Sequence, residues 1–263
     1  MRNLYYYYTL LRSFLSLCWL RANAWIHDRM SVRKGQKTIL VVGDGFAEGF
    51  GDWVVFGRRA GAARFFEKLA AGDEYLRCSW RVESAGHFGS CSEEWIPSCS
   101  RKPTCSAWGV RETLWKDLVG SGAFARASVI VLMLGSMDRL WATEPASYKS
   151  TAENIKLICK ELSRVYGKKI VVCTMAGSGS EDSLCQDDVN RNVLIKTFVE
   201  EEEKGAISIG ADLFYIHDRN NSVRCFDGIH FNAAGYKRCA LKCWEAVQPL
   251  CVQSEWAGWK KRL

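Results

Sequence analysis

The sequence lacks several patterns that would point to common classes of protein. Its twelve cysteines include no C-x-x-C pair, which removes the usual spacings of zinc sites and thioredoxin-like redox sites. No internal repeat or low-complexity linker divides the chain. We therefore expect one main domain without a metal or a cofactor. The pairing of the cysteines stays open, although Cys91, Cys99 and Cys105 share one loop in which an oxidising compartment could pair two of them.

The body of the chain also lacks net charge. The total is +7, but residues 1–37 hold seven Lys and Arg against one Asp, and residues 255–263 hold three against one Glu. Residues 38–254 are therefore left with a net charge of −1. A nucleic-acid-binding face needs clustered Lys and Arg on the folded domain, so we expect no nucleic-acid partner.

No acidic residue precedes Asp28, and the first thirty residues are largely apolar with recurring arginines. This composition fits a secretory signal, with Ala22-Asn23-Ala24 as a cleavage site, or an organelle presequence. A plain disordered segment or a docking helix is the third alternative. A helix that spans a membrane is disfavoured because the apolar run is short and contains Arg12. The compartment stays open between the secretory pathway, an organelle and the cytoplasm.

Short β-branched runs alternate with stretches of helical periodicity. Such alternation predicts an α/β fold, a three-layer α/β/α sandwich with a five-stranded parallel sheet. The expected strands are 38–43, 80–84, 129–134, 169–174 and 206–209, and the expected helices lie around 62–69, 107–118, 155–165 and 193–198 and after Asn232. We expect a targeting segment or disordered tail at 1–34, the domain at 35–250 and a basic tail at 251–263. Ligands of such folds bind at the carboxyl ends of the strands.

Four segments near those strand ends resemble the conserved blocks of SGNH (GDSL-type) hydrolases. They occur in the order of that family and at similar distances: Gly43-Asp44-Gly45-Phe-Ala-Glu-Gly49, Ala85-Gly86-His87-Phe-Gly89-Ser90, Gly135-Ser-Met137-Asp138, and Asp227-Gly-Ile-His230. One block alone is weak evidence, but four in register are strong. The resemblance covers residues 38–248 and implies a flavodoxin-like esterase or lipase fold.

The resemblance also implies a role for each matched residue. His230 would be the general base and Asp227 the carboxylate that orients it. The amides of Gly45 and Gly89 would be oxyanion donors, and Asp44 would belong to the binding site. We expect a small-molecule ester or acyl ligand, and the oligomeric state stays open.

Two positions depart from the family pattern. Gly45 stands where the family has its serine nucleophile, and Met137 stands where it has an asparagine donor. Loss of a triad serine costs on the order of a millionfold in turnover, and loss of one oxyanion donor about a hundred- to a thousandfold more. The leading hypothesis is therefore a scaffold without standard serine esterase activity, which binds an acyl or glycosyl ester. Gly45→Ser with Met137→Asn should then raise ester hydrolysis.

Two alternatives remain. His230 could activate water directly, or a hydroxyl of Ser90, Ser92 or Ser136 could replace the missing nucleophile. A nucleotide-binding module is supported only by the glycine-rich turn after the first strand, and Glu48 breaks its fingerprint. In the hydrolase-like interpretation, we expect roughly 6–9 Å between the Cα of Gly45 and the imidazole of His230, enough for a hydroxymethyl group and a hydrogen bond. His87 is expected to be exposed in its loop.

Overall fold

The computed structural model of the chain contains one parallel sheet of five strands. It describes residues 2–30, 37–103, 112–138, 147–176, 186–202, 205–216 and 223–260, without the side chains of 2–6. The strands are β1 (Lys37–Gly43), β2 (Trp80–Gly86), β3 (Val129–Met133), β4 (Lys169–Thr174) and β5 (Ile207–Asp212). Their order is β2-β1-β3-β4-β5, and all of the pairings are parallel. The predicted α/β fold is confirmed.

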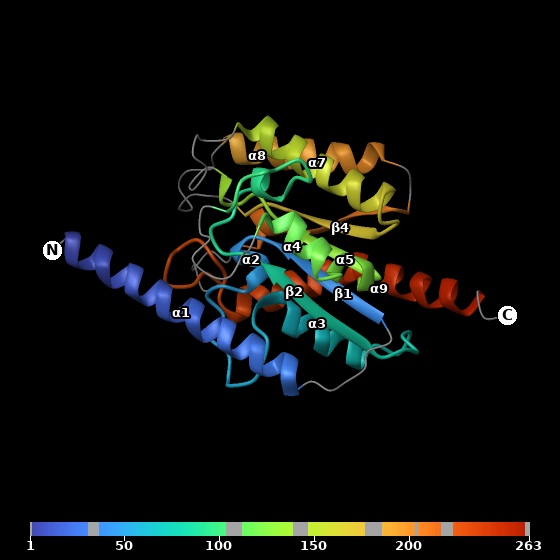
Figure 1. Ribbon diagram of the computed structural model, residues 1–263, viewed down its shortest axis with the longest axis horizontal. Coiled ribbons are helices and arrows are strands. Elements are labelled where there is room, and N and C mark those ends of the chain that lie inside the picture. The colour runs from blue at the N-terminus through green and yellow to red at the C-terminus, as the bar shows by residue number, and fades with distance from the viewer. Residues whose placement is uncertain are drawn as a thin grey trace.

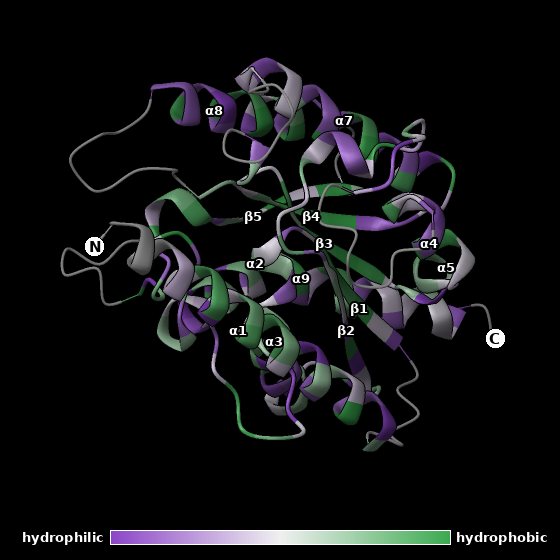
Figure 2. Cartoon of the chain, turned by 60° about the vertical axis from the view of Figure 1, so that its left-hand side comes forward, coloured by the Kyte–Doolittle hydropathy of each residue, from purple (hydrophilic) through white to green (hydrophobic). Residues whose placement is uncertain are grey.

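Helices cover both faces of this sheet (Figures 1 and 2). Side chains alternate along β1, so Ile39 and Val41 join one core while Leu40 and Val42 join the other. The first core includes α3 (Gly61–Gly72) and α9 (Ala233–Lys260). The second includes α4 (Leu114–Gly120), α5 (Ala123–Arg126), α7 (Tyr148–Arg164) and α8 (Gln186–Glu201). Two 3-10 turns, Ser92–Trp95 and Leu213–Tyr215, follow β2 and β5.

Both ends of the chain are helical, whereas we expected a targeting segment or disordered tail at the N-terminus and a basic tail at the C-terminus. Arg2–Met30 forms the helix α1, which packs its Leu17 and Leu20 against Phe50 and Val54. This arrangement agrees with the docking-helix alternative, and a targeting role for the segment stays a prediction. At the other end, α9 continues past residue 251 to Lys260, because buried contacts extend along the helix beyond the expected boundary.

The remaining differences are local. The helix expected at 107–118 begins at Leu114 in the described part of the chain, and residues 104–111 lie outside it. β5 extends three residues beyond its expected end, to Asp212. Cys91 and Cys99 are both free thiols, and Cys105 lies outside the described residues. Among the described residues, no cluster of His, Cys, Asp or Glu could hold a metal ion, and no helix is long and apolar enough to cross a membrane.

Candidate active site

The first block lies in the turn between β1 and the short helix α2 (Gly45–Glu48). Asp44 begins this helix, because its Oδ1 accepts a hydrogen bond from the amide of Phe46 at 3.0 Å. Its second oxygen accepts from the amide of Ser136 at 3.1 Å, which ties the first block to the third. Burial raises the pKa of Asp44 to about 6, although these two amides and His230 oppose the shift. Asp44 thus holds together the segments that follow β1 and β3.

The third block is fixed by buried polar contacts. Asp138 accepts hydrogen bonds from the amide and hydroxyl of Ser92 and from the hydroxyl of Thr151. Burial raises the pKa of Asp138, and the hydrogen bonds from Ser92 oppose that shift. The side chain of Met137 is buried in the first core with Phe46. A thioether at this position supplies no hydrogen-bond donor to the site.

The second block lies close to the first. The amide of His87 donates to the carbonyl of Gly43 at 2.8 Å, and Glu48 accepts from the amide of Phe88 at 2.7 Å. Gly89 follows in a tight turn with φ of +76°, a conformation that favours glycine. The amide of Gly45 lies at the first position of α2, where a helix offers no internal acceptor. Both glycine amides predicted as oxyanion donors therefore lie in adjoining turns.

Asp227 and His230 form the predicted pair. Nδ1 of His230 lies 2.6 Å from Oδ2 of Asp227, whose other oxygen accepts from the amides of Ile229 and His230. Burial disfavours the carboxylate, but the hydrogen bond and charge of His230 outweigh it and hold the pKa of Asp227 below its ordinary value. The carboxylate therefore fixes both the position and the tautomer of the imidazole.

The imidazole of His230 points directly at Gly45. A Cβ atom added at residue 45 would lie 2.3 Å from Nε2 of His230 and 3.1 Å from the ring of Phe88. With one carbon–carbon bond of about 1.5 Å, Nε2 is no more than about 3.8 Å from the Cα of Gly45. The expected separation of 6–9 Å is therefore wrong. The imidazole occupies the space that a serine side chain would need.

Aromatic rings enclose this imidazole. The ring centroids of Phe46, Phe50 and Phe88 lie 4.7, 5.0 and 5.4 Å from that of His230. His230 is 1% exposed, and within the described residues its Nε2 has no hydrogen-bond partner. Sequence reasoning missed this enclosure, although Phe46 and Phe50 stand close to Gly45 in the chain. Within the described residues, none of the hydroxyls of Ser90, Ser92 and Ser136 forms a hydrogen bond with Nε2 of His230. Ser90 instead donates to the carbonyl of His87, and Ser92 donates to Asp138.

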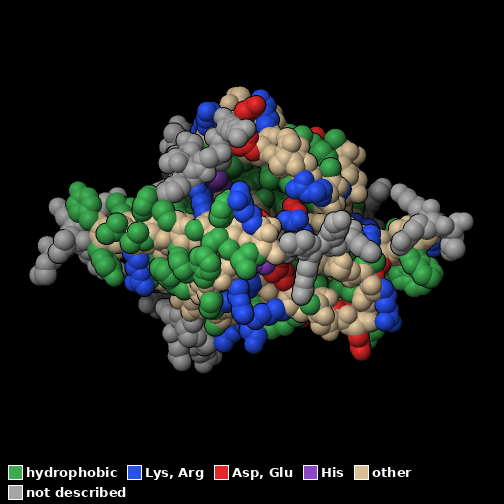
Figure 3. Space-filling model, turned by 60° about the horizontal axis from the view of Figure 1, so that its bottom comes forward, with side chains coloured by type: hydrophobic (Ala, Val, Ile, Leu, Met, Phe, Trp, Pro, Cys, Tyr) green, Lys and Arg blue, Asp and Glu red, His purple; other side chains and the backbone are tan. Residues whose placement is uncertain are grey.

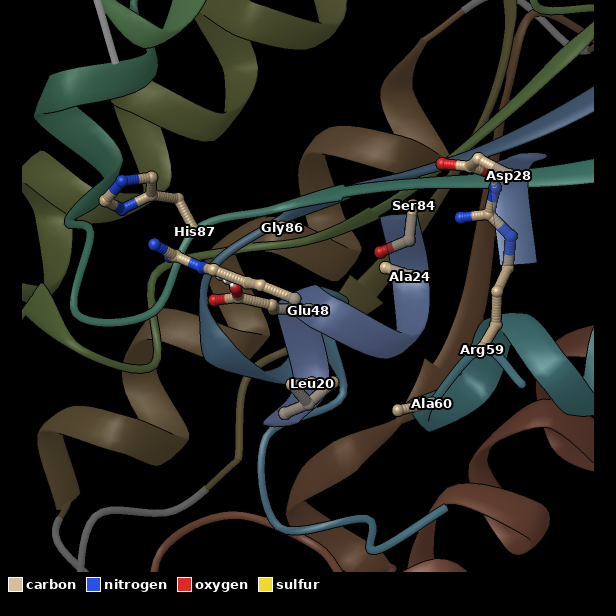
Figure 4. Close-up of a pocket in the computed structure, with 10 residues that line it drawn as sticks. Leu20, Ala24, Asp28, Glu48, Arg59, Ala60, Ser84, Gly86 and His87 are labelled. Carbon is tan, nitrogen blue, oxygen red and sulfur yellow. Dashed lines mark hydrogen bonds and ion pairs between the residues drawn. The ribbon is translucent and has the colours of Figure 1, made fainter. Parts of the chain in front are cut away.

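A cavity of about 270 Å³ adjoins the first two blocks. Glu48, Gly86 and His87 line it from the domain, and Leu20 and Ala24 line it from α1 (Figure 4). His87 is buried at 6% exposure, so the expectation of an exposed loop histidine is wrong. Burial lowers the pKa of His87, and its two ring nitrogens have no hydrogen-bond partner among the described residues. The acidic Glu48 that breaks the dinucleotide fingerprint instead binds Arg21 of α1 at 2.8 Å.

Comparison with known proteins identifies the fold. The sequence matches no protein-family model and no curated protein. Solved structures do match over most of their length. A lipase/acylhydrolase from Enterococcus faecalis is 15% identical with a TM-score of 0.53, covering 82% of this chain and 94% of its own. A carbohydrate esterase of family 3 from Talaromyces cellulolyticus is 13% identical with a TM-score of 0.56, covering 82% and 98%. A lipolytic protein of the G-D-S-L family from Veillonella parvula is 17% identical with a TM-score of 0.53, covering 80% and 97%.

These structures are lipases and esterases with an α/β/α architecture, and they define the class of scaffold to which this chain corresponds. The chain has the SGNH (GDSL-type) hydrolase fold. The sequence resemblance to that group of enzymes is confirmed at the level of the fold.

Proposed function

We propose that this protein uses an SGNH esterase and lipase scaffold to bind an acyl or glycosyl ester without forming an acyl-enzyme. One observation carries the proposal: Nε2 of His230 lies 2.3 Å from the position of a Cβ at residue 45. In this proposal, Gly45 stands at the nucleophile position, and the base has closed over the space that the nucleophile would fill. Met137 supplies no second donor for an oxyanion.

The adjoining cavity supports the binding part of the proposal. Its volume of about 270 Å³ is close to the lower end of the range for small-molecule sites. Glu48 of the first block and Gly86 and His87 of the second line it. The rest of its wall combines the apolar Leu20 and Ala24 of α1 with charged side chains, Arg21, Asp28 and Arg59. An acyl or acetylated sugar group offers apolar atoms and acceptor oxygens to such a wall.

The alternative is a hydrolase in which His230 activates water. The hydrogen bond between Asp227 and His230 favours it, since that pair is the general-base machinery of the fold. The enclosure of Nε2 counts against it, because a base must lie within hydrogen-bond reach of the water that it deprotonates.

Hydrolysis of p-nitrophenyl acetate by the wild type and by His230→Ala distinguishes the binding proposal from the hydrolase alternative. We expect both to remain at the rate of buffer, whereas turnover in the wild type that disappears in His230→Ala would establish the hydrolase alternative. Calorimetric titration with an acetylated xylose oligomer and with its deacetylated form tests the binding. Equal affinity for the two oligomers, or no binding of either, would contradict ester recognition. The variant Ser84→Trp places a large side chain in the cavity and should weaken binding of the acetylated oligomer at least about tenfold.

A further inference from the structure

The face of α1 that packs on the domain is the more polar of its two faces. Arg21 binds Glu48 at 2.8 Å, and the side-chain oxygen of Asn23 accepts a hydrogen bond from the amide of Gly57 at 2.7 Å. Asn23 is 1% exposed, which is rare for a polar side chain on a terminal helix. These contacts fix the rotation of the helix about its own axis, and they therefore determine which residues face outward.

The outward face of α1 is apolar. Leu11, Leu15 and Trp25 are 58%, 54% and 57% exposed. Leu11, Cys18, Ala22 and Trp25 follow one another at steps of seven, four and three residues, the spacing of a single helical stripe. A surface helix of a soluble domain normally has the opposite arrangement, with its apolar stripe on the core and its polar side chains in water.

A second element extends the apolar stripe. The loop after α2 exposes Trp53, Val55 and Phe56 at 54%, 71% and 64%. This loop is joined to α1, because the indole N–H of Trp19 donates to the carbonyl of Val54 at 3.0 Å and its ring lies 6.3 Å from that of Phe56. Hydrophobic side chains form a band along α1, with Lys and Arg side chains at its borders (Figure 3). We call the outward residues of α1 together with residues 53–56 the apolar band.

The charges around the apolar band are basic. No Asp or Glu occurs before residue 28, and Asp28 itself is paired with Arg59. Arg29 lies over the ring of Trp25, with its guanidinium carbon 4.1 Å from the ring centroid, and Arg12 lies over Phe226 at 4.2 Å. Exposed Trp beside Arg is typical of helices that lie in the interface of a bilayer containing anionic lipids. A second copy of the same surface would bring like charges together, which disfavours a symmetric dimer.

We propose that the apolar band docks the protein on a bilayer that contains anionic lipids, with α1 lying in the plane of the interface. A crossing of the membrane is not part of this proposal, since no helix among the described residues is long and apolar enough for it. The inference is independent of the function proposed for the esterase-like site.

Co-sedimentation of the full chain with vesicles tests the proposal. We expect binding to phosphatidylcholine vesicles that contain 30% phosphatidylserine, and at least about fivefold weaker binding to pure phosphatidylcholine, because each arginine near an anionic surface contributes about that factor. Leu11→Glu with Leu15→Glu should weaken binding about a hundredfold, at about tenfold for each exposed leucine replaced by a charge. Trp53→Ser, in the loop, should weaken it about tenfold by the same reasoning.

The matched control is Leu157→Glu with Leu241→Glu. These leucines are 51% and 47% exposed on α7 and α9, so the change in net charge and the kind of substitution are the same. The control should bind like the wild type. Absence of wild-type binding, or an equal loss in both double variants, would overturn the proposal. So would sedimentation velocity without lipid that finds a wild-type dimer and a monomeric Leu11/Leu15 variant, because a second copy would then cover the apolar band.

Discussion

Gly45→Ala is the smallest change that tests how closely His230 approaches residue 45. The new methyl group would lie 2.3 Å from Nε2, whereas ordinary contacts of a Cβ atom begin near 3.4 Å. The imidazole would have to retreat by about 1 Å. It cannot do so freely, because Asp227 holds its other nitrogen at 2.6 Å and three phenylalanine rings surround it.

The cost follows from that geometry. Forcing an extra methyl group into a packed site costs about 1–3 kcal/mol, and replacing glycine by alanine in a helix returns about 0.5–1 kcal/mol. We expect Gly45→Ala to lower the free energy of unfolding by up to about 2.5 kcal/mol. In a His230→Ala background the imidazole is gone and only the ring of Phe88, at 3.1 Å, is still tight, so the same change should be close to neutral. The interaction energy of the double-mutant cycle is therefore about 1–3 kcal/mol.

Urea unfolding at pH 7 gives the free energy of unfolding of the four proteins in the cycle, which are the wild type, the two single variants and the double variant. Gly72→Ala is the control, because Gly72 also lies in a helix and a Cβ there meets nothing within 4 Å. This control should be neutral or stabilising by up to about 1 kcal/mol. If Gly45→Ala is tolerated as well as Gly72→Ala, or costs the same with and without His230, the imidazole does not fill the space beside residue 45.

Three further predictions concern the site and the packing of α9. The pKa of Asp44, raised from 3.8 to about 6, means that the folded protein keeps a proton that the unfolded chain has lost between those values. Relative to Asp44→Asn, the free energy of unfolding of the wild type should therefore fall by up to about 3 kcal/mol as the pH rises from 4 to 7, as measured in urea titrations. If the free energies of the two proteins depend on pH in the same way, the raised pKa of Asp44 is contradicted. Glu255→Ala should lower the free energy of unfolding by about 2–4 kcal/mol, because the carboxylate of Glu255 accepts hydrogen bonds from two backbone amides and one indole N–H. The control is Glu245→Ala on the exposed side of the same helix, which should be within about 0.5 kcal/mol of the wild type. Gly45→Ser with Met137→Asn should leave hydrolysis of p-nitrophenyl acetate at the rate of the wild type and lower stability, because the imidazole of His230 fills the space that the serine side chain would need. A rate at least about tenfold above that of the wild type would show that the imidazole gives way to the serine.

The order of the strands and helices, and the position of the four blocks at the ends of strands, could be predicted from the amino-acid sequence. β-branched runs ending at Gly43 and Thr174 predicted their strands closely, because a buried parallel strand needs a continuous apolar run and little else. The spacing of Asp227 and His230 likewise predicted a contact that spans only two intervening residues. Local sequence fixes such features because their physical causes are local.

The surroundings of those residues depend on contacts between segments that lie far apart in the chain. Gly45 and His230 are far apart in the chain, and their approach depends on how α9 and β1 pack and on the rings that hold the imidazole. The burial of His87 could not be predicted for the same reason, since residues of α1 lie across the cavity from it. The outward face of α1 also could not be known from its composition, because apolar residues occur all around that helix. Its rotation is set by Arg21 and Asn23 through partners on other elements, and periodicity carries no information about such partners.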